Sequence, residues 1–144
     1  MSHSYTKIWI HAIWATKLRA PLIQSKFESQ LHQFIRDQLR ELGCPVRIIN
    51  GMPDHIHCLF LLSRDKSIAD VIGHIKGRSS YYVNQQKWTN EAFAWQTGYA
   101  AFAVSQSVTE RVFHYIRNQK EHHRKKTYYQ EYSAFLNIHG ISTP

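Results

Sequence analysis

Hydrophobic positions along this chain recur with two different periods, and each change of period predicts a new element. Residues 5–16 are rich in aromatic and β-branched side chains, which favour an extended strand. From Ser25 to Gly43 the period becomes helical, with Ser25 and Glu28 spaced as a capping box and Gly43 as a stop, so we expect a helix of about eighteen residues. Its apolar stripe consists of Phe27, Leu31, Phe34, Ile35, Leu39 and Leu42.

The middle of the chain predicts a β-hairpin followed by a second helix. Residues 46–49 form a short strand pattern, and the pair Asn50-Gly51 is typical of a tight turn. Residues 55–62 form an apolar run of strand length, so the two segments are expected to pair antiparallel. A capping pattern at Ser67 begins the next helix.

The last third of the chain predicts one more strand and two helices. A loop over residues 88–97 precedes a strand-like segment, residues 98–105. Capping boxes predict a helix over residues 107–123 and a final helix that begins at Thr127 and ends at Gly140.

This order of elements is that of a ferredoxin-like, or RRM-like, α+β fold. Such a fold is an antiparallel sheet with helices on one face, here extended by C-terminal helices. A length of 144 residues with 43% hydrophobic side chains suits one compact domain over residues 1–144.

The sequence lacks the patterns that would place it in or across a membrane. No uncharged apolar window reaches the roughly 18 residues of a spanning helix, and the first four residues lead into a strand pattern rather than a signal peptide. Cys44 and Cys58 belong to no wider cysteine framework, which fits reduced, buried thiols. We therefore expect a soluble cytoplasmic protein with no membrane partner.

The charge is strongly positive, at +8 from 18 Lys and Arg against 10 Asp and Glu. Such an excess favours an anionic partner, most often nucleic acid, although a merely solvated basic surface is the alternative. The charge gathers within residues 111–126, which include three histidines and the basic residues Arg111, Arg117, Lys120, Arg124, Lys125 and Lys126.

Two histidines at the start of the predicted strand 55–62 are the first candidate for chemistry. His55 and His57 lie two residues apart, so they share one face of the strand at about 6 to 7 Å, a separation at which two imidazoles can hold one divalent ion. The alternative is that each is a polar residue satisfied by a backbone carbonyl. His11, in the first strand, would lie near them if the two strands are neighbours.

Tyr115 and Gln119 are the second candidate. They are four residues apart in the helix predicted over residues 107–123 and would share one helical face. In a ferredoxin-like fold the histidine strand is central and the C-terminal helices lie against the sheet, so the two side chains could meet the histidines. The alternative is a core tyrosine and a surface glutamine.

Several motifs occur in an order that resembles one family. They are HAIWATKLR at 11–19, PDHIH at 53–57, KGRSS at 76–80, WQTGYAAF at 95–102 and YIRNQKEHHRK at 115–125. In this order they resemble the single-tyrosine HUH transposases of small bacterial insertion sequences, which include the tyrosine transposases associated with repetitive extragenic palindromes.

The resemblance implies metal-dependent cleavage and rejoining of single-stranded DNA through a 5′-phosphotyrosine intermediate. Tyr115 matches the family's nucleophile, and His55, His57 and Gln119 match its ligands for Mg²⁺ or Mn²⁺. Family members act as homodimers, and the tyrosine helix can complete its own chain's site or its partner's.

A basic and aromatic groove would suit single-stranded or hairpin DNA, whose bases can stack on side chains. Its predicted members are Arg78, Tyr81, Tyr82, Arg117 and Lys120. One rival reading is a non-catalytic ferredoxin-like binder of single-stranded nucleic acid, against which stands the missing aromatic RNA-binding strand motif. Another is a replication initiator or relaxase, against which stand the short chain and the spacing of Tyr115 and Gln119.

Overall fold

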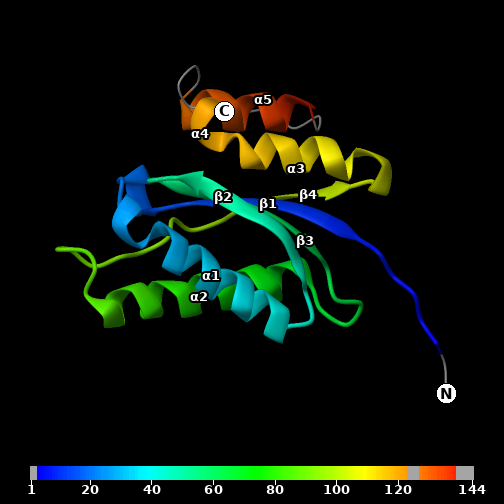
Figure 1. The fold of residues 1–144 in the computed structure, drawn as a ribbon, viewed down its shortest axis with the longest axis horizontal. Coiled ribbons are helices and arrows are strands. Elements are labelled where there is room, and N and C mark those ends of the chain that lie inside the picture. The colour runs from blue at the N-terminus through cyan, green and yellow to red at the C-terminus, as the bar shows by residue number, and fades with distance from the viewer. Residues whose placement is uncertain (1–2, 123–126, 139–144) are drawn as a thin grey trace.

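A single antiparallel sheet forms the centre of the computed structural model, which describes residues 3–122 and 127–138 (Figure 1). Its strands, in the spatial order β2-β3-β1-β4, are β1 (Trp9–Ala15), β2 (Val46–Met52), β3 (His55–Leu61) and β4 (Ala100–Val104). Every pairing is antiparallel, and the two central strands are β1 and β3. The ferredoxin-like α+β prediction is confirmed.

Helices cover both faces of this sheet (Figure 1). One face carries α1 (Ser25–Glu41) and α2 (Ile68–Gln86). The other carries α3 (Thr109–Arg117), α4 (Gln119–His122) and α5 (Tyr128–Ile138). Short 3-10 turns lie at Lys17–Arg19 and Gln106–Val108. Among the described residues no helix is both long and apolar enough to cross a bilayer.

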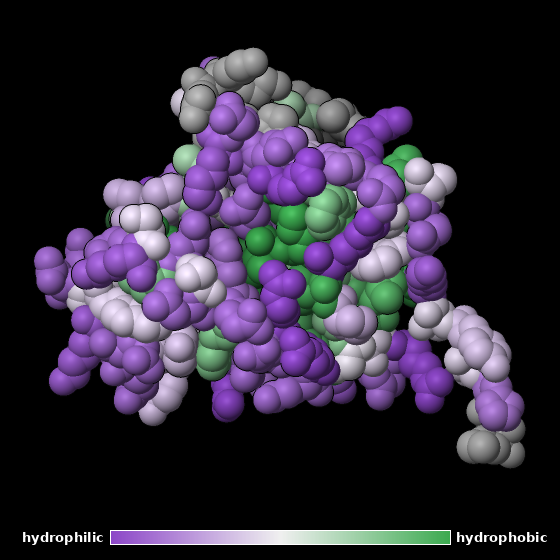
Figure 2. Space-filling model, in the orientation of Figure 1, coloured by the Kyte–Doolittle hydropathy of each residue, from purple (hydrophilic) through white to green (hydrophobic). Residues whose placement is uncertain are grey.

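Alternation along the central strands divides the two faces chemically. Side chains of β1 and β3 that point toward α1 and α2 form the main core, which includes Ile10, Ala12, Trp14, Ile56, Cys58 and Phe60. The opposite positions hold His11, His55 and His57, each buried and in contact with a residue of the C-terminal helices. Both cysteines are free and buried, as expected, although Cys44 lies in the loop before β2. The outer surface beside β2 is mainly hydrophilic, with a hydrophobic area below α3 (Figure 2).

The hairpin turn lies later than the sequence predicted. Asn50 and Gly51 belong to β2, and the turn is formed by Pro53 and Asp54. Gly51 pairs with Ile56 in the sheet, and Asn50 donates its side-chain N–H groups to carbonyls at the end of α3. These contacts keep both residues in extended backbone, so the prediction of a turn at Asn50-Gly51 was wrong.

The helix predicted over residues 107–123 is interrupted at Asn118. Its first residues form a 3-10 turn, and α3 begins at Thr109 rather than at a Ser107 cap. The carbonyls of Ile116 and Arg117 accept hydrogen bonds from Asn50 at 3.1 Å each, which ends α3, and α4 restarts at Gln119.

Of the other capping predictions, two are confirmed and one is wrong. The Ser67 hydroxyl accepts from the Asp70 N–H at 3.1 Å, and Thr127 and Gln130 form a reciprocal capping box, as predicted. Ser25 makes no cap hydrogen bond because it is already the first helical residue. The predicted helix end at Gly140, and the basic residues 124–126, lie outside the described residues.

Candidate metal and tyrosine site

The two histidines of β3 lie in a buried group of polar side chains, His55, His57, Gln119 and Glu131, which we call the cluster. His55 and His57 are both fully buried, and their ring centroids are 5.2 Å apart. Their common face follows from the alternation of β3, as the sequence predicted. The residues around them determine which ring nitrogens face each other.

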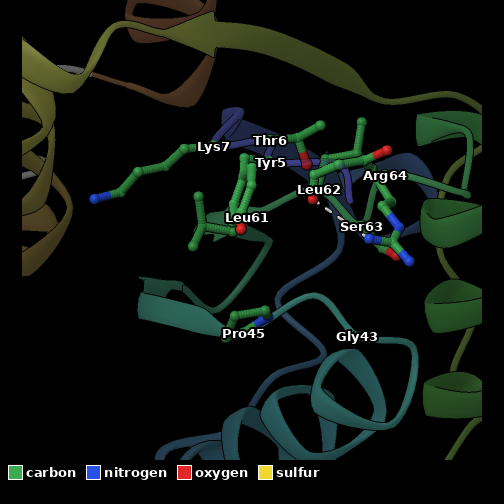
Figure 3. A pocket seen from close by; sticks show the side chains of 10 residues that line it. Tyr5, Thr6, Lys7, Gly43, Pro45, Leu61, Leu62, Ser63 and Arg64 are labelled. Carbon is green, nitrogen blue, oxygen red and sulfur yellow. Dashed lines mark hydrogen bonds between the residues drawn. The ribbon is translucent and has the colours of Figure 1, made fainter. Parts of the chain in front are cut away.

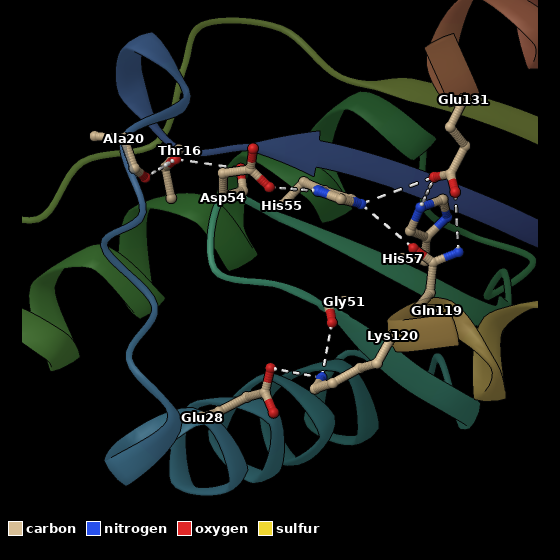
Figure 4. Close-up of polar contacts among 10 residues, drawn as sticks. All are labelled: Thr16, Ala20, Glu28, Gly51, Asp54, His55, His57, Gln119, Lys120 and Glu131. Atoms are coloured by element: carbon tan, nitrogen blue, oxygen red, sulfur yellow. Dashed lines mark hydrogen bonds and ion pairs between the residues drawn. The ribbon is translucent and has the colours of Figure 1, made fainter. Parts of the chain in front are cut away.

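A neighbouring side chain contacts the Nδ1 atom of each ring. Nδ1 of His55 lies 2.7 Å from Oδ1 of Asp54, in the hairpin turn, and Nδ1 of His57 lies 2.9 Å from Nε2 of His11, on β1. Both Nε2 atoms therefore point toward the inside of the cluster (Figure 4). This arrangement of outer partners is usual around metal-binding histidines because it fixes the ring orientation and tautomer.

A carboxylate that sequence reasoning missed enters the cluster from α5. Oε1 of Glu131 lies 2.7 Å from Nε2 of His57 and 3.8 Å from Nε2 of His55. The residue is only 4% exposed. Its sequence context, a glutamate within a tyrosine-rich helix, carries no motif. The available signal was the Thr127 capping box, which determines where α5 begins but not where the helix docks.

Gln119 reaches the same cluster. It is fully buried, its Oε1 lies 3.3 Å from Nε2 of His55, and its Nε2 donates to Oε2 of Glu131 at 3.4 Å (Figure 4). The alternative of a surface glutamine is therefore wrong. The residue is the first of α4 rather than part of the tyrosine helix, so the break at Asn118 brings it to the histidines.

Tyr115 lies beside the histidines of its own chain. Its ring centroid is 5.9 Å from that of His57 and 6.5 Å from that of His11. Burial, followed by a hydrogen bond to Glu131 and the charge of that carboxylate, raises the pKa of the phenol well above its usual value, against an opposing hydrogen bond with Gln119. The phenol is protonated at neutral pH and lies within reach of the cluster.

The donor set fits a divalent ion. Ligand atoms of His55, His57 and Glu131 all lie within 4.8 Å of one another. Imidazole nitrogens suit transition metals such as Mn²⁺, and carboxylate and amide oxygens suit Mg²⁺ and Mn²⁺. The cluster could therefore hold a metal ion, and its ligands are compatible with both Mg²⁺ and Mn²⁺.

The five predicted DNA-binding residues do not line one groove. Arg78, Tyr81 and Tyr82 are on α2, across the sheet from the cluster, whereas Arg117 and Lys120 lie on its side. DNA binding by any of the five remains a prediction.

Packing limits what two of the five can do. The Tyr82 ring stacks on Phe34 with centroids 4.1 Å apart, so that face of the ring is covered. Nζ of Lys120 donates to Glu28 and to the Gly51 carbonyl at 3.0 and 2.8 Å (Figure 4), so it also ties α4 to α1 and β2.

A separate cavity of about 650 Å³ lies at the other end of β3 (Figure 3). It is lined by Ser4, Tyr5, Thr6, Lys7, Gly43, Pro45, Leu61, Leu62, Ser63 and Arg64. Leu61 and His55 are at opposite ends of the strand, so this cavity is not part of the cluster.

Comparison with known proteins matches residues 4–119 to a family model described as IS200-like transposases. The chain is 25% identical over 118 residues to the ISDra2 transposase TnpA of Deinococcus radiodurans, covering 77% of this chain and 83% of that one. It is 28% identical over 132 residues to the transposase for insertion sequence element IS200 of Salmonella typhimurium, covering 84% and 82%.

Two solved structures share the fold. A candidate transposase of Deinococcus radiodurans R1 is 26% identical with a TM-score of 0.62, over 83% of this chain and 96% of that one. A REP-associated tyrosine transposase bound to a REP hairpin is 17% identical with a TM-score of 0.53, over 83% and 70%. The family match spans His55, His57, Tyr115 and Gln119, and it ends before α5.

Proposed function

This chain belongs to the IS200-like transposase family, and on that premise we propose that it cleaves and rejoins single-stranded DNA through a covalent bond to Tyr115. The observation that supports this proposal best is the position of the phenol, 5.9 Å between ring centroids from His57 and hydrogen-bonded to the cluster.

His55, His57 and Gln119 are the proposed ligands of a Mg²⁺ or Mn²⁺ ion. Such an ion, when bound, polarises a scissile phosphate and stabilises the negative charge that develops on it. The outer partners Asp54 and His11 hold both imidazoles with Nε2 inward, so the protein presents these donors already oriented.

Tyr115 is the proposed nucleophile. Its phenolic oxygen bonds to the phosphorus while the bond from phosphorus to the 3′ oxygen breaks, which leaves a 5′-phosphotyrosine and a free 3′-hydroxyl. The phenol proton must leave during attack, because the raised pKa keeps the group protonated beforehand. A 3′-hydroxyl of another strand can then attack the same phosphorus and release the tyrosine, so rejoining needs no ATP.

Single-stranded or hairpin DNA is the proposed substrate. The net charge of +8 favours it, and the related transposase with a solved complex is bound to a REP hairpin. A mobile element has two ends and each chain has one such tyrosine, which supports a homodimer. In such a dimer the helix that carries Tyr115 completes either its own chain's site or the partner's.

A covalent trapping experiment tests this proposal. The full chain is incubated with Mn²⁺ and a panel of labelled single-stranded hairpins, and adducts that survive denaturation are sought. We expect an adduct that Tyr115→Phe abolishes and that Tyr5→Phe, which alters an exposed tyrosine ahead of β1, leaves intact. Intact DNA binding with no adduct on any hairpin would favour the non-catalytic binding module instead.

A matching variant separates chemistry from affinity. His57→Ala should lose the adduct while keeping most of the DNA affinity, since phosphate contacts elsewhere supply most of the binding energy. Equal loss of both would contradict a catalytic role for His57.

A further inference from the structure

We propose that Glu131 is a further metal ligand, and that metal binding therefore fixes α5 over the sheet. This inference rests on the proposed function in one respect, namely that the histidine cluster holds a divalent ion. It goes beyond that function because it assigns a ligand on an element outside the matched span, residues 4–119.

The spacing of the donor atoms supports this assignment. Ligands that bind one ion at about 2.1 Å lie roughly 3 Å apart when they are adjacent around it. Oε1 of Glu131 is 2.7 Å from Nε2 of His57 and 3.8 Å from Nε2 of His55, and Oε1 of Gln119 is 3.3 Å from the latter atom. Four donors from β3, α4 and α5 thus enclose one small volume (Figure 4).

Burial gives a second argument. A carboxylate that is only 4% exposed carries a large desolvation penalty, which nearby positive charge must offset. The neighbours of Glu131 include two imidazoles, an amide and a phenol, which are the groups that would surround a shared ion. A divalent ion at this point supplies the compensating charge directly.

The proposed ligand changes the net charge of the metal site. Two imidazoles and an amide leave the full charge on the ion, whereas a carboxylate adds one negative charge, and affinity for hard cations rises with ligand charge. The same bond attaches α5 to the sheet, where Tyr132 already packs against Ile13, Ala100 and Phe102. Occupancy of the site and docking of α5 are then coupled.

Titration calorimetry with Mn²⁺ on the full chain tests the ligand. Glu131→Gln keeps the shape and removes the charge, and we expect it to weaken Mn²⁺ binding at least tenfold, about 1.4 kcal/mol. Glu41→Gln removes the same charge from an exposed position on α1 and should bind as the natural chain does. Equal affinity of the Glu131→Gln chain would overturn the inference and leave the Tyr115 adduct test untouched.

Hydrogen exchange on the unmodified chain keeps the inference testable even if Glu131→Gln folds poorly. Added Mn²⁺ should slow exchange in α5 as well as in β3. Protection of β3 alone would mean that the ion binds without α5 and would overturn the coupling. A chain that binds neither Mn²⁺ nor Mg²⁺ would overturn both this inference and the metal requirement of the proposed function, while adduct formation at Tyr115 would be judged separately.

Discussion

Nε2 of His11 lies 2.9 Å from Nδ1 of His57, so two histidines from neighbouring strands form a single buried hydrogen-bonded pair. The pair exists because His11 and His57 occupy the same face of β1 and β3, two positions apart in the register. When Nε2 of His57 binds an ion, its ring proton lies on Nδ1 and can be donated to His11. His11 is thus a positioning residue for the metal site.

Replacing His11 should weaken metal binding without unfolding the chain. His11→Leu introduces an apolar side chain of similar size and removes the acceptor for His57 Nδ1–H. Outer partners of metal-binding histidines are worth about 10- to 100-fold in affinity, and we expect a loss in that range by Mn²⁺ calorimetry. His11→Gln, which retains an acceptor, should recover part of the lost Mn²⁺ affinity. His74→Leu, at an exposed position on α2, should leave the Mn²⁺ affinity unchanged. Unchanged affinity in His11→Leu would contradict the positioning role.

Replacing Asp54 should also weaken metal binding, because Asp54 orients His55 as His11 orients His57. Its carboxylate accepts the Nδ1–H of His55 at 2.7 Å, and Asp54→Asn replaces a charged acceptor with a neutral amide. We expect Mn²⁺ affinity to fall about tenfold or more, since the charged partner makes the imidazole a stronger donor to the ion. Asp37→Asn, on the exposed side of α1, is the matched control. Equal behaviour of the two variants in calorimetry would rule out this contribution.

The alternation of apolar and polar side chains was enough to predict the sheet and much of the cluster. Alternation placed His55 and His57 on one face, and the order of elements placed β3 at the centre. The break at Asn118 could not be predicted, because it depends on Asn50, 68 residues earlier, which reaches the end of α3. Glu131 was missed for a similar reason, since its role depends on how α5 docks and not on any local spacing.

The division of the helices between two faces predicts which arginine contacts DNA. Arg117, on α3, lies on the side of the cluster and is exposed, whereas Arg78 is on α2 across the sheet. Arg117→Ala should weaken binding to a labelled hairpin and reduce the slope of log affinity against log salt by about 1. Arg78→Ala should change neither quantity. Binding isotherms at several salt concentrations measure both, and a larger effect at Arg78 would place the DNA on the α2 face.

His32 should make the fold sensitive to acid. Burial lowers the pKa of this side chain to about 4, with smaller effects from Glu28, which raises it, and from Lys120 and Arg36, which lower it. Between the unfolded pKa of about 6.5 and the folded pKa of about 4, the unfolded chain binds more protons at His32, so stability falls as the pH falls through this window. At pH 4.5 the protonation of His32 in the unfolded chain lowers the free energy of unfolding by about 2 kcal/mol.

Urea unfolding at pH 7 and pH 4.5 isolates this effect. Nε2 of His32 is buried without a hydrogen-bond partner among the described residues, so His32→Leu should fold and should lose about 2 kcal/mol less on acidification than the natural chain. His74→Leu removes an exposed histidine and should keep the full acid loss. An unchanged acid loss in His32→Leu would contradict the assignment.

Gly51 is expected to be irreplaceable, although it is not at the turn. A β-carbon at this position would overlap the carbonyl oxygen of His55 and lie 3.0 Å from the Cα of Ile56, and both obstacles are backbone atoms that cannot rotate away. We expect Gly51→Ala to lower the free energy of unfolding in urea by about 2 to 4 kcal/mol. Gly73→Ala is the matched control in α2, where nothing lies within 4 Å of an added β-carbon, and it should raise stability by about 0.5 to 1 kcal/mol because alanine favours helix. Because Gly51 approaches the backbone of His55 this closely, a Gly51→Ala chain as stable as Gly73→Ala would contradict the pairing of β2 with β3 at this point and with it the placement of His55.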